Sequence, residues 1–214
     1  ENAETFGKQD SLKDEKILVE YTDPNLFKEF HIGHLMSNTI GESLSRIIAW
    51  SGATVKRACY QSDVGLSIAK AIWGMVRLKE EMPLDSAKLQ EKVAFLGKAY
   101  VYGSRSYEED ENFKKEIDAL NKVIFEKSDK DINALYDWGR KVSLEHFEEL
   151  YVKLGTKFDY NFFESEAAPI GMFIIEEYLQ KGIFEKSEGA IVFPGEKYGL
   201  HTRVFVNSHG LPTY

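Results

Sequence analysis

The 214-residue sequence contains a single cysteine, Cys59. One cysteine cannot form a disulfide within the chain, and this favours a reducing compartment. The sequence also lacks any run of about 18 apolar residues, so we expect no membrane-spanning segment and no membrane partner. Residues 1–16 are polar and mixed in charge, unlike a secretory signal peptide. Together these features predict a cytoplasmic protein.

An excess of positive charge is absent as well. The chain has 27 Lys and Arg residues against 35 Asp and Glu residues, which gives a net charge of −8. General affinity for phosphate backbones depends on Lys and Arg, so this balance argues against DNA as a partner and leaves only a local basic patch open. The apolar share of 43% and the charged share of 29% are ordinary for a globular protein, which excludes a disordered, collagen-like or low-complexity chain.

The length of 214 residues fits one domain with an insertion, or two small domains. The chain begins at Glu1 rather than at a methionine, and it stops at Tyr214 without a closing loop or helix cap. We therefore expect a monomeric piece of a longer protein.

Apolar periodicity predicts alternating strands and helices in the first part of the chain. Residues 17–21 form a short apolar run before a turn, as in a buried strand. Apolar side chains at helical spacing predict a helix over residues 33–51, with Gly52 as its C-terminal cap. Residues 54–60 predict a second strand, and a further helix opens at Asp63. This order is typical of a βαβ unit on a parallel sheet.

Residues 83–155 show helical periodicity only. One apolar stripe ends near Gly103, and others follow it. Ser128 and Asp131 have the spacing of a capping box before a helix that continues to Gly155. We interpret this stretch as a helical insertion.

The remaining residues return to mixed structure. Alternating residues 158–162 predict a strand, and residues 170–181 predict a short helix closed by Gly182. Residues 190–193 and 203–206 look like the two strands of a β-hairpin.

The motif His31-Ile32-Gly33-His34 is informative because it follows a predicted strand and opens a predicted helix. A helix N-terminus offers unpaired backbone N–H groups and a partial positive charge, which suit a phosphate. Gly33 has no Cβ, so a nucleotide could approach its backbone closely. His31 and His34 are three residues apart and can project from the same side of the first turn. Two such preorganised donors would stabilise charge on a phosphoryl group by about 2.7–4 kcal/mol each.

Two other interpretations of this motif exist. His31 and His34 could simply cap the helix or fill the core, which is the usual role of a lone histidine. We favour a functional pair because Gly33 and the strand-to-helix junction accompany it. A zinc site fits poorly, since one cysteine and five histidines show no paired ligand spacing elsewhere. We predict no metal site.

Residues 19–41 resemble the signature region of class I aminoacyl-tRNA synthetases that is known as the HIGH motif. Within it, Pro24-Asn25-x-x-Lys28-x-x-His31 resembles the arginyl-tRNA synthetase family specifically. The resemblance continues at Asp63-x-Gly65, at Phe158-Asp159 with Glu164-Ser165, and at the segment that ends in Tyr214. It covers both ends of the chain, and the helical stretch 83–140 adds little to it.

This resemblance implies an α/β fold: a Rossmann-like parallel-sheet nucleotide-binding domain of the class I synthetase type, with a helical insertion and a β-hairpin near the C-terminal end. The implied organisation is a lead-in (1–16), the first half of the catalytic domain (17–82), the helical insertion (83–155) and the start of the second half (156–214).

The resemblance also implies a reaction. Arginine would attack the α-phosphate of ATP to form arginyl-adenylate and pyrophosphate, and would then pass to the 3′ end of tRNA(Arg). The implied partners are arginine, ATP and tRNA(Arg). Mg²⁺ is expected with ATP, and no prosthetic group is expected. Positioning and charge stabilisation dominate in-line transfer at phosphorus.

Site residues follow from the resemblance position by position. His31, His34 and Lys28 would be catalytic. ATP would contact His31, Gly33, His34, Asp63 and Gly65. Arginine would contact Glu20, Asn25, His31, Glu164 and Tyr214.

The acidic members of this set fit their ligand, because a guanidinium pairs bidentately with carboxylates. Glu20 could instead be an exposed charge at a strand end, and Glu166 could take the place of Glu164. Tyr214 matches a family Tyr-x-x-x-Asp pattern whose Asp would fall beyond this sequence.

Three positions depart from the family pattern. Ser62 replaces a usual glycine and adds a side chain where backbone and ligand would approach each other. Val64 stands where tryptophan is common. Met36 replaces a usual arginine, which removes a contact available to tRNA or phosphate.

Two alternatives to an arginine-specific ligase stay open. One keeps the fold and changes the substrate, as in a cysteinyl-type class I synthetase or a small His-x-Gly-His nucleotidyltransferase. The single cysteine and the long helical insertion count against these two respectively. The other alternative is a non-catalytic binding module of the same fold. We expect the isolated piece to have little or no aminoacylation activity.

Overall fold

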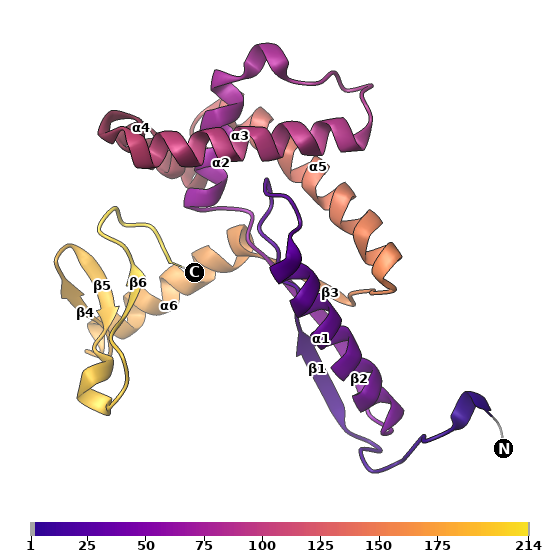
Figure 1. Ribbon diagram of the computed structural model, residues 1–214. Helices are drawn as coiled ribbons and strands as arrows, with labels where there is room; N and C mark the ends of the chain where they lie inside the picture. The colour runs from indigo at the N-terminus through magenta and orange to yellow at the C-terminus, as the bar shows by residue number, and fades with distance from the viewer. Residues whose placement is uncertain (1–2, 214) are drawn as a thin grey trace. The chain divides into compact units, whose positions relative to one another are not determined.

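A computed structural model describes residues 3–213 (Figure 1). The described residues form two compact units, which divide between residues 162 and 163.

The first unit contains a parallel sheet with a crossover helix. Strand β1 (Lys16–Glu20), helix α1 (Ile32–Trp50) and strand β2 (Thr54–Gln61) follow one another along the chain. β1 and β2 pair in parallel, with Lys16 opposite Thr54 and Glu20 opposite Ala58. Strand β3 (Tyr160–Phe163) completes the sheet in the order β1-β2-β3. The predicted βαβ unit is confirmed, because parallel neighbours require a crossover of this kind.

Helix α1 turns its polar and small side chains inward. Its buried residues are His34, Asn38, Gly41, Glu42 and Ser45. A Cβ on Gly41 would lie 2.1 Å from the ring of Tyr21, so the helix approaches the end of β1 as closely as a glycine permits. The apolar stripe that predicts this helix is on the other side and is exposed by about half or more: Met36 61%, Ile40 54%, Leu44 49% and Ile47 62%.

The helices after β2 hold the main hydrophobic core of the first unit. They are α2 (Leu66–Arg77), the short η2 (Lys79–Glu81), α3 (Leu89–Glu109), α4 (Glu111–Glu126) and α5 (Lys130–Leu154). Figure 1 shows α2, α3 and α4 gathered side by side, while α5 runs from them toward the sheet. Tyr151 of α5 contacts Cys59 of β2. Leu26 and Phe27, from the loop after β1, are fully buried in the same core. Residues 83–155, which the sequence predicts to be helical, contain α3, α4 and α5.

The prediction that a helix ends near Gly103 is wrong, because α3 continues to Glu109. Gly103 instead marks a close crossing of α2 and α3. A Cβ on Gly103 would lie 2.0 Å from the carbonyl oxygen of Lys70, and one on Gly74 would lie 2.1 Å from that of Ala99. These glycines let two helix backbones touch, a tertiary role that local propensity does not reveal.

The capping prediction at Ser128 is also wrong by one residue. The N-cap of α5 is Asp129, whose Oδ1 accepts hydrogen bonds from the backbone N–H groups of Asp131 and Ile132. A carboxylate is a stronger acceptor than a hydroxyl at a helix N-terminus, and its charge favours the positive end of the dipole. α5 runs to Gly155, as predicted, and Gly155 caps it in the left-handed conformation.

The second unit contains a helix and a small antiparallel sheet. Its elements are α6 (Glu164–Gln180), β4 (Glu185–Ser187), β5 (Ala190–Phe193), η3 (Gly195–Tyr198) and β6 (Arg203–Val206), with sheet order β4-β5-β6. The antiparallel pairing of β5 with β6 is confirmed. The helix begins at Glu164 rather than at residue 170, because Pro169 removes only one N–H donor and the helix continues through it. Strand β4 was not predicted, since Glu-Lys-Ser has no apolar alternation.

Candidate active site

The two histidines of the motif stack on each other at the start of α1. Their ring centroids are 3.7 Å apart and their planes differ by 19°. His31 Nδ1 accepts a hydrogen bond from the N–H of Gly33 at 3.1 Å, and His34 Nδ1 accepts one from the N–H of His31 at 3.4 Å. The pair therefore closes a reciprocal capping box on the helix.

This capping fixes the protonation pattern of each neutral ring. An Nδ1 that accepts a hydrogen bond carries no proton, so the proton of the neutral imidazole lies on Nε2. Burial, together with the nearby His31 and Lys28, lowers the pKa of His34 to about 4. His34 is only 7% exposed and is neutral at physiological pH. The capping interpretation and the functional one thus describe the same geometry, in which Nδ1 holds the helix and Nε2–H is left as a donor.

The position of the His31 ring leaves no room for a side chain at Gly33. A Cβ at this position would lie 2.9 Å from Cε1 and 3.1 Å from Nδ1 of His31. Behind the pair, the ring of Phe30 lies 5.2 Å from that of His34 and 6.1 Å from that of Phe147. His34 is therefore held from both the backbone and the core, whereas His31 is exposed and is held by its capping bond and by its stacking on His34.

The loop between β1 and α1 has an unusual backbone. Thr22, Asp23 and Phe27 have positive φ angles of 79°, 44° and 61°, a region that residues with side chains seldom adopt. Such conformations persist only where the surroundings enforce them, and they concentrate at functional sites. Here the surroundings are a side chain of α1 and the backbone of β2. The N–H of Thr22 donates to Ser37 Oγ, and Asp23 Oδ1 accepts from the N–H of Tyr60 at 2.7 Å.

Predicted arginine-binding residues of the first unit lie at the carboxyl end of β1. Glu20 is the last residue of β1 and is exposed. Asn25 is half-buried in the strained loop and bridges to Ser62, which directly follows β2. Burial raises the pKa of the Asp23 carboxyl, and the Glu20 carboxylate adds to the rise. Because ligands of open parallel sheets bind at this edge, the position suits a substrate pocket.

The loop after β2 lies against the loop after β1. The N–H of Ser62 donates to Pro24 O at 3.2 Å, and the N–H of Leu26 donates to Ser62 O at 3.0 Å. Gly65, with φ 96°, is the N-cap of α2 and provides no side-chain cap. The side chain at Ser62, where the family usually has glycine, is turned toward the carbonyl of Val64.

Asp63 is fully buried, and its carboxylate faces helix α5. Its Oδ2 accepts hydrogen bonds from Tyr136 OH at 3.1 Å and from Arg140 Nε at 3.0 Å. A buried carboxylate needs partners of this kind to remain charged. The side chain of Asp63 is therefore committed to the protein interior.

Lys28 lines a cleft of about 430 Å³ together with His31 and the α3 residues Gly97, Lys98 and Tyr100. Its ammonium lies 5.5 Å from the centre of the Tyr100 ring, within reach of a cation–π interaction. The cleft places Lys28 beside the first histidine of the motif. Glu29 also lines it, and Lys98 there forms an ion pair with Glu81.

The other two predicted arginine contacts belong to the second unit. Glu164 opens α6 and is 7% exposed, whereas Glu166 is exposed. Tyr214 lies outside the described residues.

The comparison with known families agrees with these observations. The family described as "tRNA synthetases class I (R), catalytic domain" matches residues 2–214. The chain belongs to this family.

Curated relatives of this synthetase chain include "Arginine--tRNA ligase" of Borreliella afzelii (strain PKo), 31% identical over 88% of the chain and 32% of that protein. "Arginine--tRNA ligase" of Lactobacillus delbrueckii subsp. bulgaricus is 32% identical over 99% of the chain and 36% of that protein. The chain thus spans about a third of the length of these relatives.

Solved synthetase structures share the fold. The arginyl-tRNA synthetase of Plasmodium falciparum matches with a TM-score of 0.66 and 23% identity, over 98% of this chain and 34% of that one. The Thermus thermophilus arginyl-tRNA synthetase matches with a TM-score of 0.65 and 21% identity, over 94% and 34%. The predicted α/β class I synthetase fold is confirmed.

The role of α5 in contacting the site loops was not predicted from the sequence of this synthetase chain. Tyr136, Arg140 and Ser143 contact the two loops that carry the predicted site. One signal was available in the sequence. The three polar residues are spaced so that they share one face of the helix.

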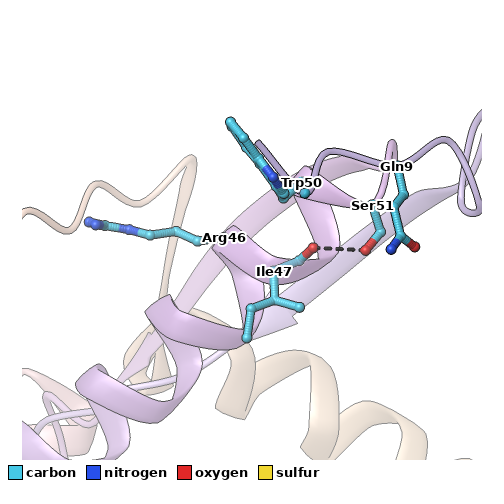
Figure 2. Close-up of a pocket in the computed structure, with 6 residues that line it drawn as sticks. Gln9, Arg46, Ile47, Trp50 and Ser51 are labelled. Carbon is cyan, nitrogen blue, oxygen red and sulfur yellow. Dashed lines mark hydrogen bonds between the residues drawn. The ribbon is translucent and has the colours of Figure 1, made fainter. Parts of the chain in front are cut away.

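A separate pocket of about 380 Å³ lies at the other end of α1, where Arg46, Trp50 and Ser51 line it with Gln9 (Figure 2). The rise of a helix places it roughly 27 Å from the histidine pair. It includes none of the predicted site residues.

No helix among residues 3–213 has the length and apolar character needed to cross a membrane. In the same residues, no three His, Cys, Asp or Glu side chains gather in a way that could hold a metal ion.

Proposed function

We propose that this chain is part of an arginine–tRNA ligase, which activates arginine with ATP and transfers it to tRNA(Arg). The observation that carries the proposal is the stacked, helix-capping histidine pair at the carboxyl edge of the parallel sheet. Family membership and relatives named as arginine–tRNA ligases support it.

In the activation step, an oxygen of the arginine carboxylate attacks the α-phosphorus of ATP. The bond between the α-phosphorus and the bridging oxygen breaks, and pyrophosphate leaves with its electron pair. Nε2–H of His31 and of His34 are the donors for the phosphate oxygens, on which charge accumulates in the transition state. Because both rings are already fixed through Nδ1, no reorganisation is needed during the reaction. Lys28 adds a cation beside His31.

In the transfer step, a ribose hydroxyl at the 3′ end of tRNA(Arg) attacks the carbonyl carbon of arginyl-adenylate. AMP leaves, and the hydroxyl proton is released. No described residue is assigned to take this proton.

ATP would lie along the N-terminal ends of α1 and α2, where Gly33 and Gly65 carry no side chain that would keep the nucleotide away. Asp63 would act by holding its loop, since its carboxylate is buried against α5. Mg²⁺ would arrive with the phosphates as part of the substrate. Asn25 would bind the α-groups of arginine, and Glu20 would pair with its guanidinium. Glu164 and Tyr214 stay predicted arginine contacts.

The decisive experiment is ATP–pyrophosphate exchange by the complete protein that contains this chain. The assay compares arginine with lysine and cysteine, with and without tRNA(Arg). We expect exchange that requires arginine. Exchange supported by cysteine would identify another class I synthetase. Exchange without any amino acid would indicate a nucleotidyltransferase, and failure to bind ATP or arginine by calorimetry would indicate a binding module. Monomeric state, cytoplasmic location and lack of DNA binding stay predictions.

A further inference from the structure

One face of α5 touches both loops that form the candidate site. Tyr136, Gly139, Arg140 and Ser143 stand at positions i, i+3, i+4 and i+7, which places them on a single helix face. Arg140 faces the loop after β2 and Ser143 the loop after β1, while Tyr136 contacts both.

The first contact fixes Phe27, which is fully buried at a positive φ. The N–H of Phe27 donates to Ser143 Oγ at 2.9 Å, and this hydroxyl donates to Gly139 O at 2.8 Å. The ring of Phe27 fits against Gly139 so closely that a Cβ there would lie 2.1 Å from the ring. Tyr136 stacks on the same ring at 6.0 Å. Phe27 is thus fixed to α5 by its backbone and by its side chain.

The second contact fixes Asp63, through Tyr136 OH and Arg140 Nε. Tyr136 therefore belongs to both contacts, with its ring on Phe27 and its hydroxyl on Asp63. The two loops also hydrogen-bond to each other through Ser62. Asn25 lies two residues before Phe27, and Gly65 lies two residues after Asp63.

We propose that α5 is the positioning element of this active site: Tyr136, Gly139, Arg140 and Ser143 hold the loops of residues 22–30 and 62–65 in the conformation that presents Asn25 to arginine and Gly65 to ATP. The identity of the two ligands, arginine and ATP, rests on the proposed function. None of the four residues needs to touch a substrate. A helix of the insertion would in this way determine substrate affinity in the nucleotide-binding domain.

The first test follows the loop itself and does not depend on the reaction. Hydrogen exchange is measured on the complete protein, on peptides that cover residues 22–30. Ser143→Ala removes the acceptor of the Phe27 N–H, so exchange at that amide should rise about fivefold to tenfold. Lys141→Ala is the matched control, because Lys141 is exposed on the same helix. Equal exchange in the two variants would overturn the proposal.

The second test separates positioning from folding by kinetics. Arg140→Lys and Tyr136→Phe change the partners of Asp63 conservatively and should raise KM for ATP severalfold, with a smaller change in KM for arginine. Ser143→Ala should raise KM for arginine more than KM for ATP. Lys141→Met is the charge-loss control, with wild-type KM values expected. A purely structural role would lower the melting temperature while the folded fraction kept wild-type KM values, and that result would contradict the proposal.

The two proposals fail in different ways. If the unmodified complete protein shows no arginine-dependent exchange, the proposed function is wrong. The hydrogen-exchange comparison still decides whether α5 positions the loops.

Discussion

At the scale of single residues, His31 and His34 each use the two nitrogens of one ring for different purposes. Nδ1 accepts a backbone N–H and caps α1, whereas Nε2 keeps its proton for a ligand. Gly33 allows this arrangement because the His31 ring occupies the space that a Cβ would need. The site therefore depends on the absence of one methyl group.

Gly33→Ala should displace the His31 ring and remove one preorganised donor. We expect the rate of arginine-dependent pyrophosphate exchange to fall by about 10²–10³, as for loss of one oxyanion donor. Gly171→Ala in α6 is the control, since nothing lies within 4 Å of a Cβ there. Steady-state exchange rates of the two variants check this, and a Gly33→Ala protein as active as the control would contradict it.

The lowered pKa of His34 also predicts a dependence of stability on pH. Burial lowers this pKa from its usual 6.5 to about 4 in the folded protein. Between these values the unfolded state binds more protons, so this residue makes folding less favourable as pH falls from about 6.5 to 4. The contribution is roughly 3 kcal/mol at pH 4 and vanishes above about pH 7.5.

The measurement is urea unfolding of the wild type and of His34→Gln across this range. The difference in unfolding free energy should be constant above pH 7.5 and should shift in favour of the variant as the solution is acidified. A difference that does not vary with pH would show that His34 is not buried in its neutral form.

At the scale of elements, two glycines control how the helices pack. α2 and α3 cross where Gly74 and Gly103 leave no room for side chains. Polar groups join α1 to the sheet, because Glu42 accepts hydrogen bonds from Tyr21 OH at 2.5 Å and from Arg57 Nε at 2.9 Å. Small or polar residues thus make these packing contacts, and the pattern of apolar residues in the sequence does not predict them.

Gly103→Ala should destabilise the first unit by about 1–3 kcal/mol, because a methyl group would overlap the carbonyl of Lys70. Gly171→Ala should instead raise the free energy of unfolding by about 0.5–1 kcal/mol, because alanine makes the unfolded chain less flexible. Chemical unfolding of both variants tests the pair. A stabilised Gly103→Ala protein would show that α2 and α3 leave room for a methyl group where they cross.

At the scale of the whole molecule, the apolar side chains are distributed unevenly. The main core lies among α2, α3, α4 and α5, whereas α1 exposes Met36, Ile40, Leu44 and Ile47. Surface of this kind in one stripe is seldom left open to water.

A polypeptide of residues 1–214 should therefore bind a hydrophobic dye such as ANS. Ile40→Gln combined with Ile47→Gln should reduce this binding. Dye fluorescence measures it. Equal dye binding by the doubly substituted chain would mean that the exposed stripe is not the binding surface.

The sequence by itself determined the local features of this protein. The order of strands and helices apart from β4, the end of α5 at Gly155 and the histidine motif at a strand-to-helix junction depend on neighbouring residues. Periodicity and capping chemistry reveal them. Tertiary structure decided which side of α1 is buried, why α3 passes through Gly103, and that Asp63 faces α5. Each of these depends on groups brought together from distant parts of the chain, where close packing and the need to pair a buried charge outweigh local preference.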